Sequence, residues 1–383
     1  MSRDTDGPVH RAGADDPREQ RALIGLSLVN GVGASRIRAL LAQFGSATAV
    51  MNAPRTALTR VNGVGPQTAA AITQFDDYAA VDTQLERAAQ LGATLIMPWD
   101  NRFPTRLRQI YDPPALLWMR GTLTPADDRA LAIVGTRRCT DYGKRQAHRF
   151  AQALVQAGFT VVSGLAYGID GAAHRGALDA GGRTLAVLGS GVNRIYPSKH
   201  KRLAQSIIEQ GAVLSEYPLD APPDASNFPE RNRIVSGTTL GTLVVESHRE
   251  GGALITARMA VEQNREVFAV PGDVGRKAAV GTNRLIQRGH AKLVLDVDDI
   301  LDELGMEPAA PDATGEAPDE ASTPTSLNAV EQRLYEALDS DPVHIDTLCA
   351  DTEIDPSTAL VYLLSLEFKG LVRQMAGKQF YRV

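Results

Sequence analysis

Small and basic residues directly follow several short apolar runs of this chain, and together they are suited to binding phosphate groups. The segments in question are 135–138 (Gly-Thr-Arg-Arg), 163–170, 189–191 with 196–199, 227–233 and 246–252. Small side chains let a phosphate approach backbone N–H groups, and arginine or lysine then neutralises its charge. One glycine-rich segment would be weak evidence, whereas several that converge on one edge of a sheet favour a phosphate-rich ligand.

Motifs for a single nucleotide are missing from these segments. A dinucleotide site would need G-x-G-x-x-G directly after the first strand, where this chain has Gly-Thr-Arg-Arg, and no G-x-x-x-x-G-K-[ST] occurs. A wide rim of separated basic residues suits a chain of phosphates, such as single-stranded DNA, better than one nucleotide. We therefore predict DNA contacts from Gly135, Thr136, Arg137, Arg138, Ser163, Gly164, Arg175, Gly189, Ser190, Gly191, Arg194, Lys199, Lys201, Phe228, Arg231, Asn232, Arg233, Gly251 and Gly252.

Three titratable residues in these segments could suggest catalysis, but structural roles explain them better. Asp170 and His174 stand four residues apart on one helix face. We expect Asp170 near the helix start and His174 hydrogen-bonded inside the protein. Glu246 is expected to order the turn at 251–252 through backbone N–H groups. We predict no catalytic residue, no metal and no cofactor, so that the protein is not an enzyme.

The elements that would position these segments alternate between strand and helix. Apolar runs lie at 130–134, 160–162, 184–188, 212–214, 242–245, 266–269 and 291–295, with helical patterns at 143–157, 172–180 and 253–264. This rhythm predicts an α/β fold, a Rossmann-like and mostly parallel sheet with helices on both faces. Ligands of such sheets bind outside the carboxyl ends of the strands, which is where the candidate residues stand.

Two similar glycine hairpins, at 29–33 and 61–65, mark an N-terminal all-α domain. Each precedes a helical pattern, at 35–44 and 66–75, as in a tandem helix-hairpin-helix or SAM-like unit. We place this domain at 21–75, after a disordered tail at 1–20. The hairpins could contact phosphate through backbone N–H groups or only pack within the chain, and both readings stay open.

The remaining segments complete a five-part organisation. A helix at 78–91 and an irregular proline-rich stretch form an N-terminal extension of the Rossmann-like domain, which we place at 76–305. Residues 306–326 hold 4 prolines and 5 acids and predict a flexible linker. Helices at 329–338, at 345–349 and after Asp355 and Pro356, with a hairpin at 372–375 and 379–383 turning at Gly377, predict a winged-helix domain at 327–383.

Charge is unevenly distributed along the chain, whose formal net charge is −5. Residues 129–202 carry 12 Lys and Arg against 3 acids, residues 21–75 carry 5 Arg and no acid, and residues 327–383 carry 5 bases against 9 acids. Anion binding follows the local potential, so the average hides two basic regions. The acidic winged-helix region has one base in its third helix, which favours a protein partner over DNA.

Composition points to a cytoplasmic protein. The chain has no apolar run of about 18 residues, so we expect no membrane segment. Residues 1–20 lack the apolar stretch of a signal peptide. The two cysteines, Cys139 and Cys349, stand in unrelated contexts, which fits a reducing compartment and argues against a disulfide framework.

Over residues 95–295 the chain resembles the DprA/Smf family. The resemblance rests on Ile-Val-Gly-Thr-Arg at 133–137, Ser-Gly-Leu-Ala-Tyr-Gly-Ile-Asp at 163–170 with His174, Tyr-Pro at 196–197, Phe-Pro-Glu-Arg-Asn-Arg at 228–233 and Val-Pro-Gly at 270–272. These motifs follow one another in the order and spacing of that family, and the winged-helix pattern also fits it.

The resemblance implies a recombination mediator of natural transformation. Members bind and protect incoming single-stranded DNA, load the RecA recombinase onto it in the presence of single-strand-binding protein, and act as homodimers. Carried over by motif, Arg137 is the first phosphate ligand, followed by Lys199 and Lys201. Ser198 stands where relatives often have a lysine, so Lys199 would take its place. Phe228 would stack on a base.

Two other functions stay open at this stage. The first is a nucleotide phosphoribohydrolase of the lysine-decarboxylase-like Rossmann group. Gly241, Thr242 and Glu246 echo its signature turn, but the Pro-Gly-Gly of that turn is missing. The second is a double-stranded DNA binder that acts through the hairpin repeat.

Overall fold

The computed structural model describes residues 16–307, 329–339, 342–352, 354–368, 371–375 and 379–382. The chain divides into a larger unit, Met1–Asp312, and a smaller unit, Ala313–Val383. The first fifteen residues of the expected tail, most of the linker predicted at 306–326, and the turn at Gly377 lie outside the described residues. No helix in the described ranges is long and apolar enough to cross a membrane.

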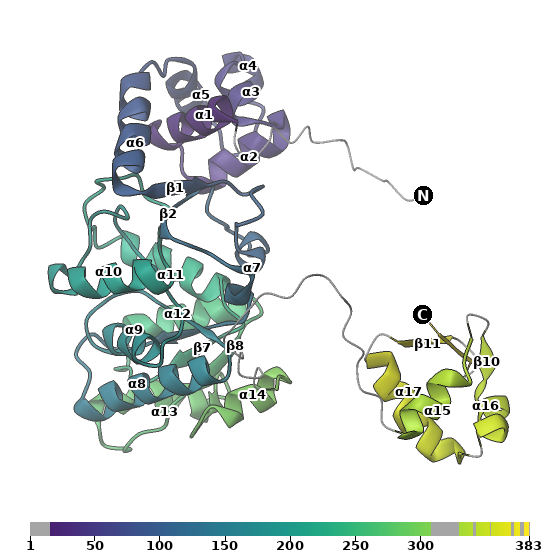
Figure 1. The fold of residues 1–383 in the computed structure, drawn as a ribbon. Coiled ribbons are helices and arrows are strands. Elements are labelled where there is room, and N and C mark those ends of the chain that lie inside the picture. The colour runs from purple at the N-terminus through teal and green to yellow at the C-terminus, as the bar shows by residue number, and fades with distance from the viewer. Residues whose placement is uncertain are drawn as a thin grey trace. The chain divides into compact units, whose positions relative to one another are not determined.

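The N-terminal part is helical, as the hairpin repeat predicts (Figure 1). Asp16 accepts a hydrogen bond from the N–H of Arg18 and Pro17 stands at the first helical position, so the helix starts before the predicted end of the tail at residue 20. Arg36 donates from Nε to the carbonyl oxygen of Gly63 at 2.8 Å, which links the second hairpin to the helix after the first. The helices are α1 (Pro17–Leu28), α2 (Ala34–Phe44), α3 (Ala47–Met51), α4 (Arg55–Leu58), α5 (Pro66–Thr73) and α6 (Tyr78–Leu91).

A nine-stranded sheet forms the centre of the larger unit, in the order β1-β2-β6-β5-β4-β3-β7-β8-β9. Neighbours from β6 to β9 pair in parallel, whereas β1 with β2 and β2 with β6 pair antiparallel. The strands are β1 (Ala93–Ile96), β2 (Leu117–Gly121), β3 (Ala130–Val134), β4 (Thr160–Ser163), β5 (Thr184–Val187), β6 (Ala212–Ser215), β7 (Gly241–Val244), β8 (Glu266–Ala269) and β9 (Lys292–Leu293). The Rossmann-like, mostly parallel fold is thereby confirmed.

Strands β1 and β2 correct the expectation of irregular structure after the helix at 78–91. They lie in the proline-rich stretch but contain none of its prolines. Each is only four or five residues long, and β2 is stabilised by pairing with β6, nearly a hundred residues further along the chain. A strand held by such distant pairing leaves a weak local signal in the sequence.

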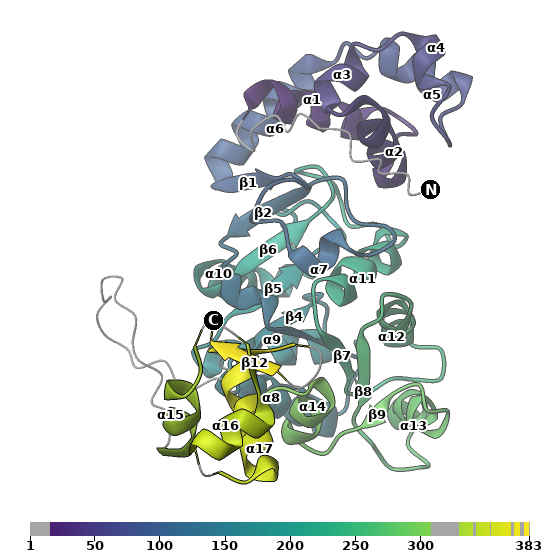
Figure 2. The same cartoon turned by 90° about the vertical axis from the view of Figure 1, so that its right-hand side faces the viewer.

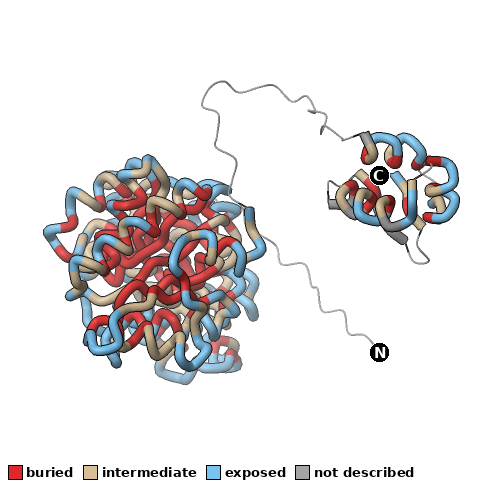
Figure 3. The backbone as a smooth tube through the Cα atoms, turned by 90° about the horizontal axis from the view of Figure 1, so that it is seen from below, coloured by how far each residue is buried: buried red, intermediate tan, exposed pale blue. Residues whose placement is uncertain are grey.

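Helices cover both faces of the sheet because alternate strand residues point to opposite sides. Leu131 and Ile133 of β3 pack with α8, α9 and α14, whereas Ala132 and Val134 pack with α7, α11 and α12. Figure 2 shows the sheet between these layers, and Figure 3 shows the buried residues inside the larger unit. The helices are α7 (Thr105–Arg108), α8 (Asp141–Gln156), α9 (Ile169–Asp179), α10 (Lys201–Gln210), α11 (Asn227–Gly237), α12 (Gly252–Glu262), α13 (Val280–Gln287) and α14 (Asp298–Leu304).

Strand order reverses direction at β3. From β3 the chain adds β4, β5 and β6 on one side, and then returns to add β7, β8 and β9 on the other. The connections that leave the carboxyl ends of β3 and β7 therefore diverge and leave a crevice between them, as at other topological switch points. The segment after β6 includes a helix, because residues 227–237 form α11. The predicted DNA contacts Phe228, Arg231, Asn232 and Arg233 are therefore helical residues.

The smaller unit has the winged-helix order of elements and its own core. Helices α15 (Ala329–Glu336), α16 (Ile345–Thr352) and α17 (Pro356–Phe368) pack around Leu334, Leu348 and Leu363. Asp355 caps α17 by accepting from the N–H of Thr358 at 3.1 Å. Strands β11 (Val372–Met375) and β12 (Gln379–Arg382) pair as predicted, and a short β10 (Val343–His344), which the sequence reading missed, adds a third strand.

Acid sensitivity should follow from a histidine in the core of the larger unit. His174 of α9 is fully buried and its Nδ1 lies 2.7 Å from Thr184 Oγ1, and burial, followed by the charge of His200, lowers the pKa of His174 to about 3. An unfolded histidine has a pKa of about 6.5. Below that pH the histidine is protonated in the unfolded chain but stays neutral in the folded chain. The free energy of unfolding therefore decreases as the pH is lowered, by up to about 1.4 kcal/mol per pH unit for this group.

We therefore expect His174→Asn to flatten the pH dependence of stability between about pH 6 and pH 4. Urea unfolding of both proteins over this range measures it, because the carboxylates titrate in both and cancel in the difference. Parallel stability curves for the two proteins would show that His174 is not the group responsible.

Candidate functional site

A pocket of about 730 Å³ lies at the topological switch point of the sheet. Its walls come from the segments that follow β3, β4 and β7 and from helices α11 and α12. Ten of the predicted contacts line it: Gly135, Thr136, Arg137, Arg138, Gly164, Phe228, Arg231, Asn232, Gly251 and Gly252. The switch point therefore brings together residues that are separated by more than a hundred positions in the sequence.

The open side of the pocket carries cations and aromatic rings. Arg137 and Arg138 are both exposed, and the guanidinium carbon of Arg137 lies 4.9 Å from the centre of the Phe228 ring. Phe228 is half-buried, and its ring centre lies 5.9 Å from that of Tyr196, which is 47% exposed. Asp141, the acid nearest to Arg137 in the sequence, directs its carboxylate to Lys144 at 3.4 Å. The positive charge of Arg137 thus stays available beside two flat rings.

Arg231 belongs to the same pocket but is almost completely buried, at 4% exposure. Its guanidinium donates to the carbonyl oxygens of Gly164, at 2.8 Å, and Val187. These carbonyls terminate β4 and β5, so one side chain from α11 fixes the ends of two strands. In the structure it supports the pocket from within, and the DNA contact that the sequence suggested for it stays a prediction.

Asp170 supplies the counter-charge to this buried guanidinium. Its carboxylate accepts from the N–H groups of Gly164 at 3.1 Å and Ala166 at 3.3 Å, which orders the segment after β4. Burial raises the pKa of Asp170, while Arg231 and these hydrogen bonds act in the opposite direction. Burial likewise lowers the pKa of Arg231 to about 10, against the charge of Asp170. As expected, Asp170 stands at the helix start, and it and His174 have separate partners, so they form no acid–base pair.

Most of the glycines predicted to contact phosphate are packed against the protein itself. A side chain at Gly135 would come within 2.4 Å of Ile169, and one at Gly164 within 2.5 Å of the Arg231 guanidinium. Similar contacts with the protein itself surround Gly189, Gly191 and Gly251, whereas the space beside Gly252 is open. Most of these glycines therefore allow the loops to pack closely.

Glu246 also differs from expectation. Its buried carboxylate accepts from the N–H of Thr140 at 2.9 Å and from Thr140 Oγ1 at 2.5 Å. It thus orders the segment before α8, not the turn at Gly251 and Gly252. This carboxylate does not line the pocket.

The N-terminus of α12 opens on the pocket and adds to its positive potential. Gly251, Gly252 and Ala253 line the pocket, and no side chain caps this helix start. Unpaired N–H groups and the helix dipole favour an anion there. Sequence reasoning missed His248 and Ile255, which line the same wall. His248 stands two residues after Glu246, so the strand-end argument could have found it.

The other nine predicted residues lie outside this pocket. Lys199, Lys201 and Arg175 are exposed, and Arg194 is exposed and 3.3 Å from Asp220. Ser163 donates to the carbonyl of Ile133, and Ser190 to that of Arg194. Arg233 is held by Glu216 at 2.6 Å and Asp112 at 3.1 Å with only 12% of its side chain exposed, so its charge is already neutralised. Gly189 and Gly191 complete this group.

Comparison with protein families agrees with this three-part architecture. The family of DNA recombination-mediator protein A matches residues 94–305, the DprA winged helix domain matches 317–378, and the SAM-like helix-hairpin-helix tandem matches 22–75. A Rossmann-like domain that follows a helix-hairpin-helix domain and precedes a winged-helix domain in the sequence defines the class of DNA recombination-mediator proteins.

Individual relatives resemble most of the chain. Protein Smf of Synechocystis sp. is 33% identical over 95% of this chain and 99% of its own, and protein Smf of Escherichia coli is 40% identical over 74% and 76%. The X-ray structure of DNA processing protein A from Streptococcus pneumoniae has a TM-score of 0.67 at 33% identity, covering 74% of this chain and 97% of that one. The chain belongs to the DNA recombination-mediator protein A family, also called DprA/Smf.

A second solved structure addresses single-stranded DNA directly. It is that of DNA processing protein A from Helicobacter pylori, described for its single-stranded DNA binding mode, with a TM-score of 0.51 at 28% identity over 56% of this chain and 97% of that one. The likeness covers about half of the present chain.

Removing the buried guanidinium should destabilise the larger unit. Arg231→Met leaves two strand-end carbonyls without their donor and leaves Asp170 without its counter-charge. We expect the free energy of unfolding to fall by about 3–5 kcal/mol, as for other broken buried charge pairs. Urea unfolding measures it, with Arg138→Met as the control, since an exposed arginine should change stability by about 0.5 kcal/mol or less. Equal unfolding midpoints for both variants would contradict the supporting role of Arg231.

Proposed function

We propose that this protein binds single-stranded DNA in the pocket at the switch point and acts as a recombination mediator. The observation that carries the proposal is that one pocket, at the uncapped N-terminus of α12, is lined by the exposed Arg137 and Arg138 and by the rings of Phe228 and Tyr196, with Arg137 beside Phe228. Guanidinium groups and free N–H groups bind phosphate, while flat rings stack on bases of any sequence. The single-strand binding described for the Helicobacter pylori relative supports the same ligand.

The contacts we propose are those whose groups are free to meet a ligand. They are the exposed Arg137, Arg138 and Tyr196, together with Thr136, Phe228, Asn232 and the N–H groups at Gly251 and Gly252. Lys199, Lys201 and Arg175 are exposed beyond the pocket and would meet phosphates further along the strand. The buried Arg231, Ser163 and Ser190 support the loops, as does Arg233 through its two carboxylate partners.

The finer role follows from family membership. We propose that the protein loads the RecA recombinase onto incoming single-stranded DNA during natural transformation, protects that DNA, and works with single-strand-binding protein as a homodimer in the cytoplasm. The acidic winged-helix unit would contact a protein partner, since its residues 327–383 carry 9 acids against 5 bases. Activity as a binding protein needs no catalytic group, and Glu246 is engaged by Thr140 rather than turned to the pocket.

Arg137→Ala tests the pocket most directly. Loss of a charge-assisted contact to phosphate should weaken binding of single-stranded oligonucleotides by about 1–3 kcal/mol, equally for all base sequences. The slope of log affinity against log salt should fall by about 0.7, the value for one phosphate of a single strand. Fluorescence anisotropy across a salt series measures both effects.

Arg145→Ala is the matched control, because Arg145 is exposed on α8 and lines none of the pocket. It should cost little affinity. Equal weakening by both substitutions would assign the affinity to general charge rather than to a defined pocket, and unfolding of Arg137→Ala would assign Arg137 a structural role.

Deletion of residues 327–383 should leave single-strand affinity nearly unchanged. The two units have separate cores, so the larger one keeps its packing without the smaller. The deleted residues carry a net negative charge, so their loss should not reduce the electrostatic attraction of the protein for phosphate. Binding of the truncated and full-length chains to the same oligonucleotide measures this, and a strong loss of affinity would contradict the protein-contact role of the winged helix.

A further inference from the structure

A third aromatic ring, that of Tyr167, stands beside the pocket without being part of its lining. Tyr167 is 41% exposed, whereas the residue before it, Ala166, lines the pocket together with Phe228 and Tyr196. Both Ala166 and Tyr167 belong to the segment 164–168, which joins β4 to α9. The ring of Tyr167 is therefore open to a ligand that extends past the pocket.

The backbone around Tyr167 is fixed by buried contacts. Leu165, which is fully buried, has a φ of 56°, a left-handed conformation that residues other than glycine rarely adopt. Its carbonyl oxygen lies 2.9 Å from Nδ1 of His200, and the carbonyl oxygen of Ala166 accepts from the N–H of Gly171 at 3.1 Å. Strained backbone of this kind persists only where its surroundings determine it, and it is concentrated at ligand sites. The segment thus presents Tyr167 from a defined position.

The same segment packs directly against the backbone of Arg137. Gly168 has a φ of 80°, and a side chain there would collide with the carbonyl oxygen of Thr136 and come within 2.8 Å of that of Arg137. Glycine allows this close approach because it has no Cβ. Tyr167 directly precedes Gly168, so its backbone lies at the same rim of the pocket as Arg137.

A buried histidine supports the ring of Tyr167, and cations lie beside that histidine. The ring centres of Tyr167 and His200 are 5.3 Å apart, with their planes inclined at 68°, and His200 is 5% exposed. Nη2 of Arg175 lies 3.5 Å from Nε2 of His200, and Lys199 precedes His200 in the sequence. Arg175 and Lys199 are exposed, and within the described part of the chain no ion pair involves either of them.

A supported ring with unneutralised cations nearby suits a nucleotide of a single strand. An aromatic side chain stacks on a base of any type, because every base has a flat face. Cations beside the ring bind the phosphates that join this base to its neighbours. The pocket repeats the same combination, with Arg137 next to the ring of Phe228.

We propose that Tyr167 is a base-stacking platform for the part of a single DNA strand that lies outside the pocket, with Arg175 and Lys199 bound to neighbouring phosphates. This inference rests on the proposed function and adds the direction in which the strand leaves the pocket, over the segment 164–168 toward α9 and the start of α10. It follows that Tyr167 contributes affinity for bases and none for phosphates.

Strands with and without bases test the inference on the full chain. The probes are an oligothymidine of about 20 nucleotides, longer than most single-strand sites, and a strand of equal length built from abasic sugars. Tyr167→Ala should bind the oligothymidine at least about fivefold more weakly, the loss expected for one base–aromatic stack. It should bind the abasic strand as the wild type does, with an unchanged salt slope, because no charge is lost. Tyr167→Phe keeps the ring and should bind both strands as the wild type does.

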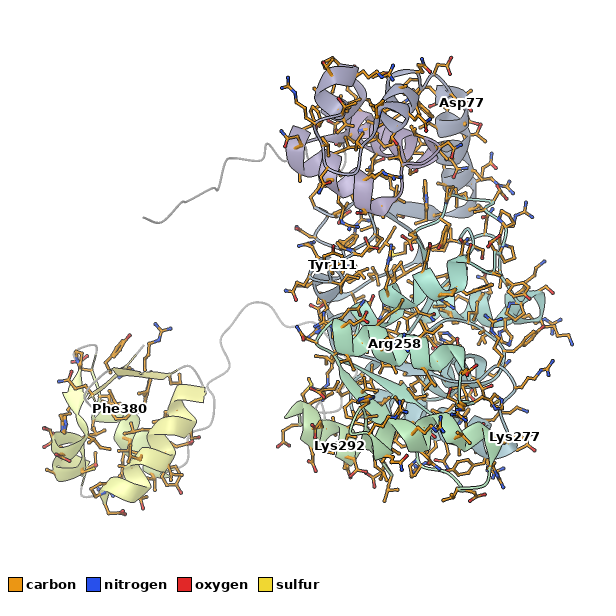
Figure 4. The ribbon with its side chains drawn as sticks, turned by 180° about the vertical axis from the view of Figure 1, so that it is seen from behind. Asp77, Tyr111, Arg258, Lys277, Lys292 and Phe380 are labelled. Atoms are coloured by element: carbon orange, nitrogen blue, oxygen red, sulfur yellow. The ribbon has the colours of Figure 1, made fainter. Side chains whose placement is uncertain are left out.

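Tyr111→Ala is the matched control. Tyr111 lies between α7 and β2, is fully exposed and lines none of the pocket (Figure 4). This variant should bind both strands as the wild type does. Equal weakening by Tyr111→Ala and Tyr167→Ala would overturn the inference. So would a loss by Tyr167→Ala that is as large for the abasic strand as for the oligothymidine, because the ring would then not act through bases.

Tyr167→Trp gives a direct signal of stacking that does not depend on the alanine variant. The natural tryptophans, Trp99 and Trp118, are not exposed, and the wild type supplies their background emission. Oligothymidine should quench the emission of Tyr167→Trp well beyond that background, because a stacked base quenches an indole ring, and the abasic strand should not. Equal emission changes in Tyr167→Trp and the wild type would overturn the inference.

The wild-type protein separates this inference from the proposed function. If it binds neither strand, single-strand binding itself is wrong, and the platform at Tyr167 is wrong with it. If it binds the oligothymidine, and Tyr167→Ala binds it equally well, only the platform is overturned, and the exposed ring serves a ligand of another class, such as a protein partner.

Discussion

A single buried guanidinium determines the shape of the proposed binding site. Arg231 reaches from α11 to the carbonyl oxygens at the ends of β4 and β5, and Asp170 balances its charge from α9. A charge removed from water is tolerated only when it is paired and hydrogen-bonded, so the positions of these loops are tightly constrained. Gly164 is part of this constraint, because a side chain there would collide with the guanidinium.

The arginines at and near the proposed site differ in their surroundings. Arg231 is buried and bonded to protein carbonyls, and Arg233, outside the pocket, is held by two carboxylates, whereas Arg137 and Arg138 are exposed in the crevice. Arg231 holds the ends of β4 and β5 in place, so that Arg137, Arg138 and the start of α12 face one space. Preorganised donors of this kind lose little entropy when they meet phosphate.

Local charge, and not net charge, explains how an acidic protein can bind DNA. The formal charge of −5 combines basic segments in the larger unit with an acidic C-terminal region. The exposed cations Arg137 and Arg138 lie at the switch-point pocket. Potential at the surface decays within roughly 10 Å in salt, so a phosphate near these groups responds to them and little to the distant acids.

The sequence by itself determined the class of fold and the neighbourhood of the site. Alternating apolar runs required a parallel sheet, and the residues after β3 and β7, such as Arg137 and Gly252, had to meet at its carboxyl edge. Short strands with distant partners, β1 and β2, escaped detection, since their pairing leaves no local pattern. Only the tertiary structure decided which arginines are free. Arg233 is neutralised by Glu216 and Asp112, whereas Arg137 is flanked by the Phe228 ring, and the sequence around the two arginines does not reveal this difference. The availability of a charge depends on neighbours that folding brings from distant positions, and no local sequence signal encodes them.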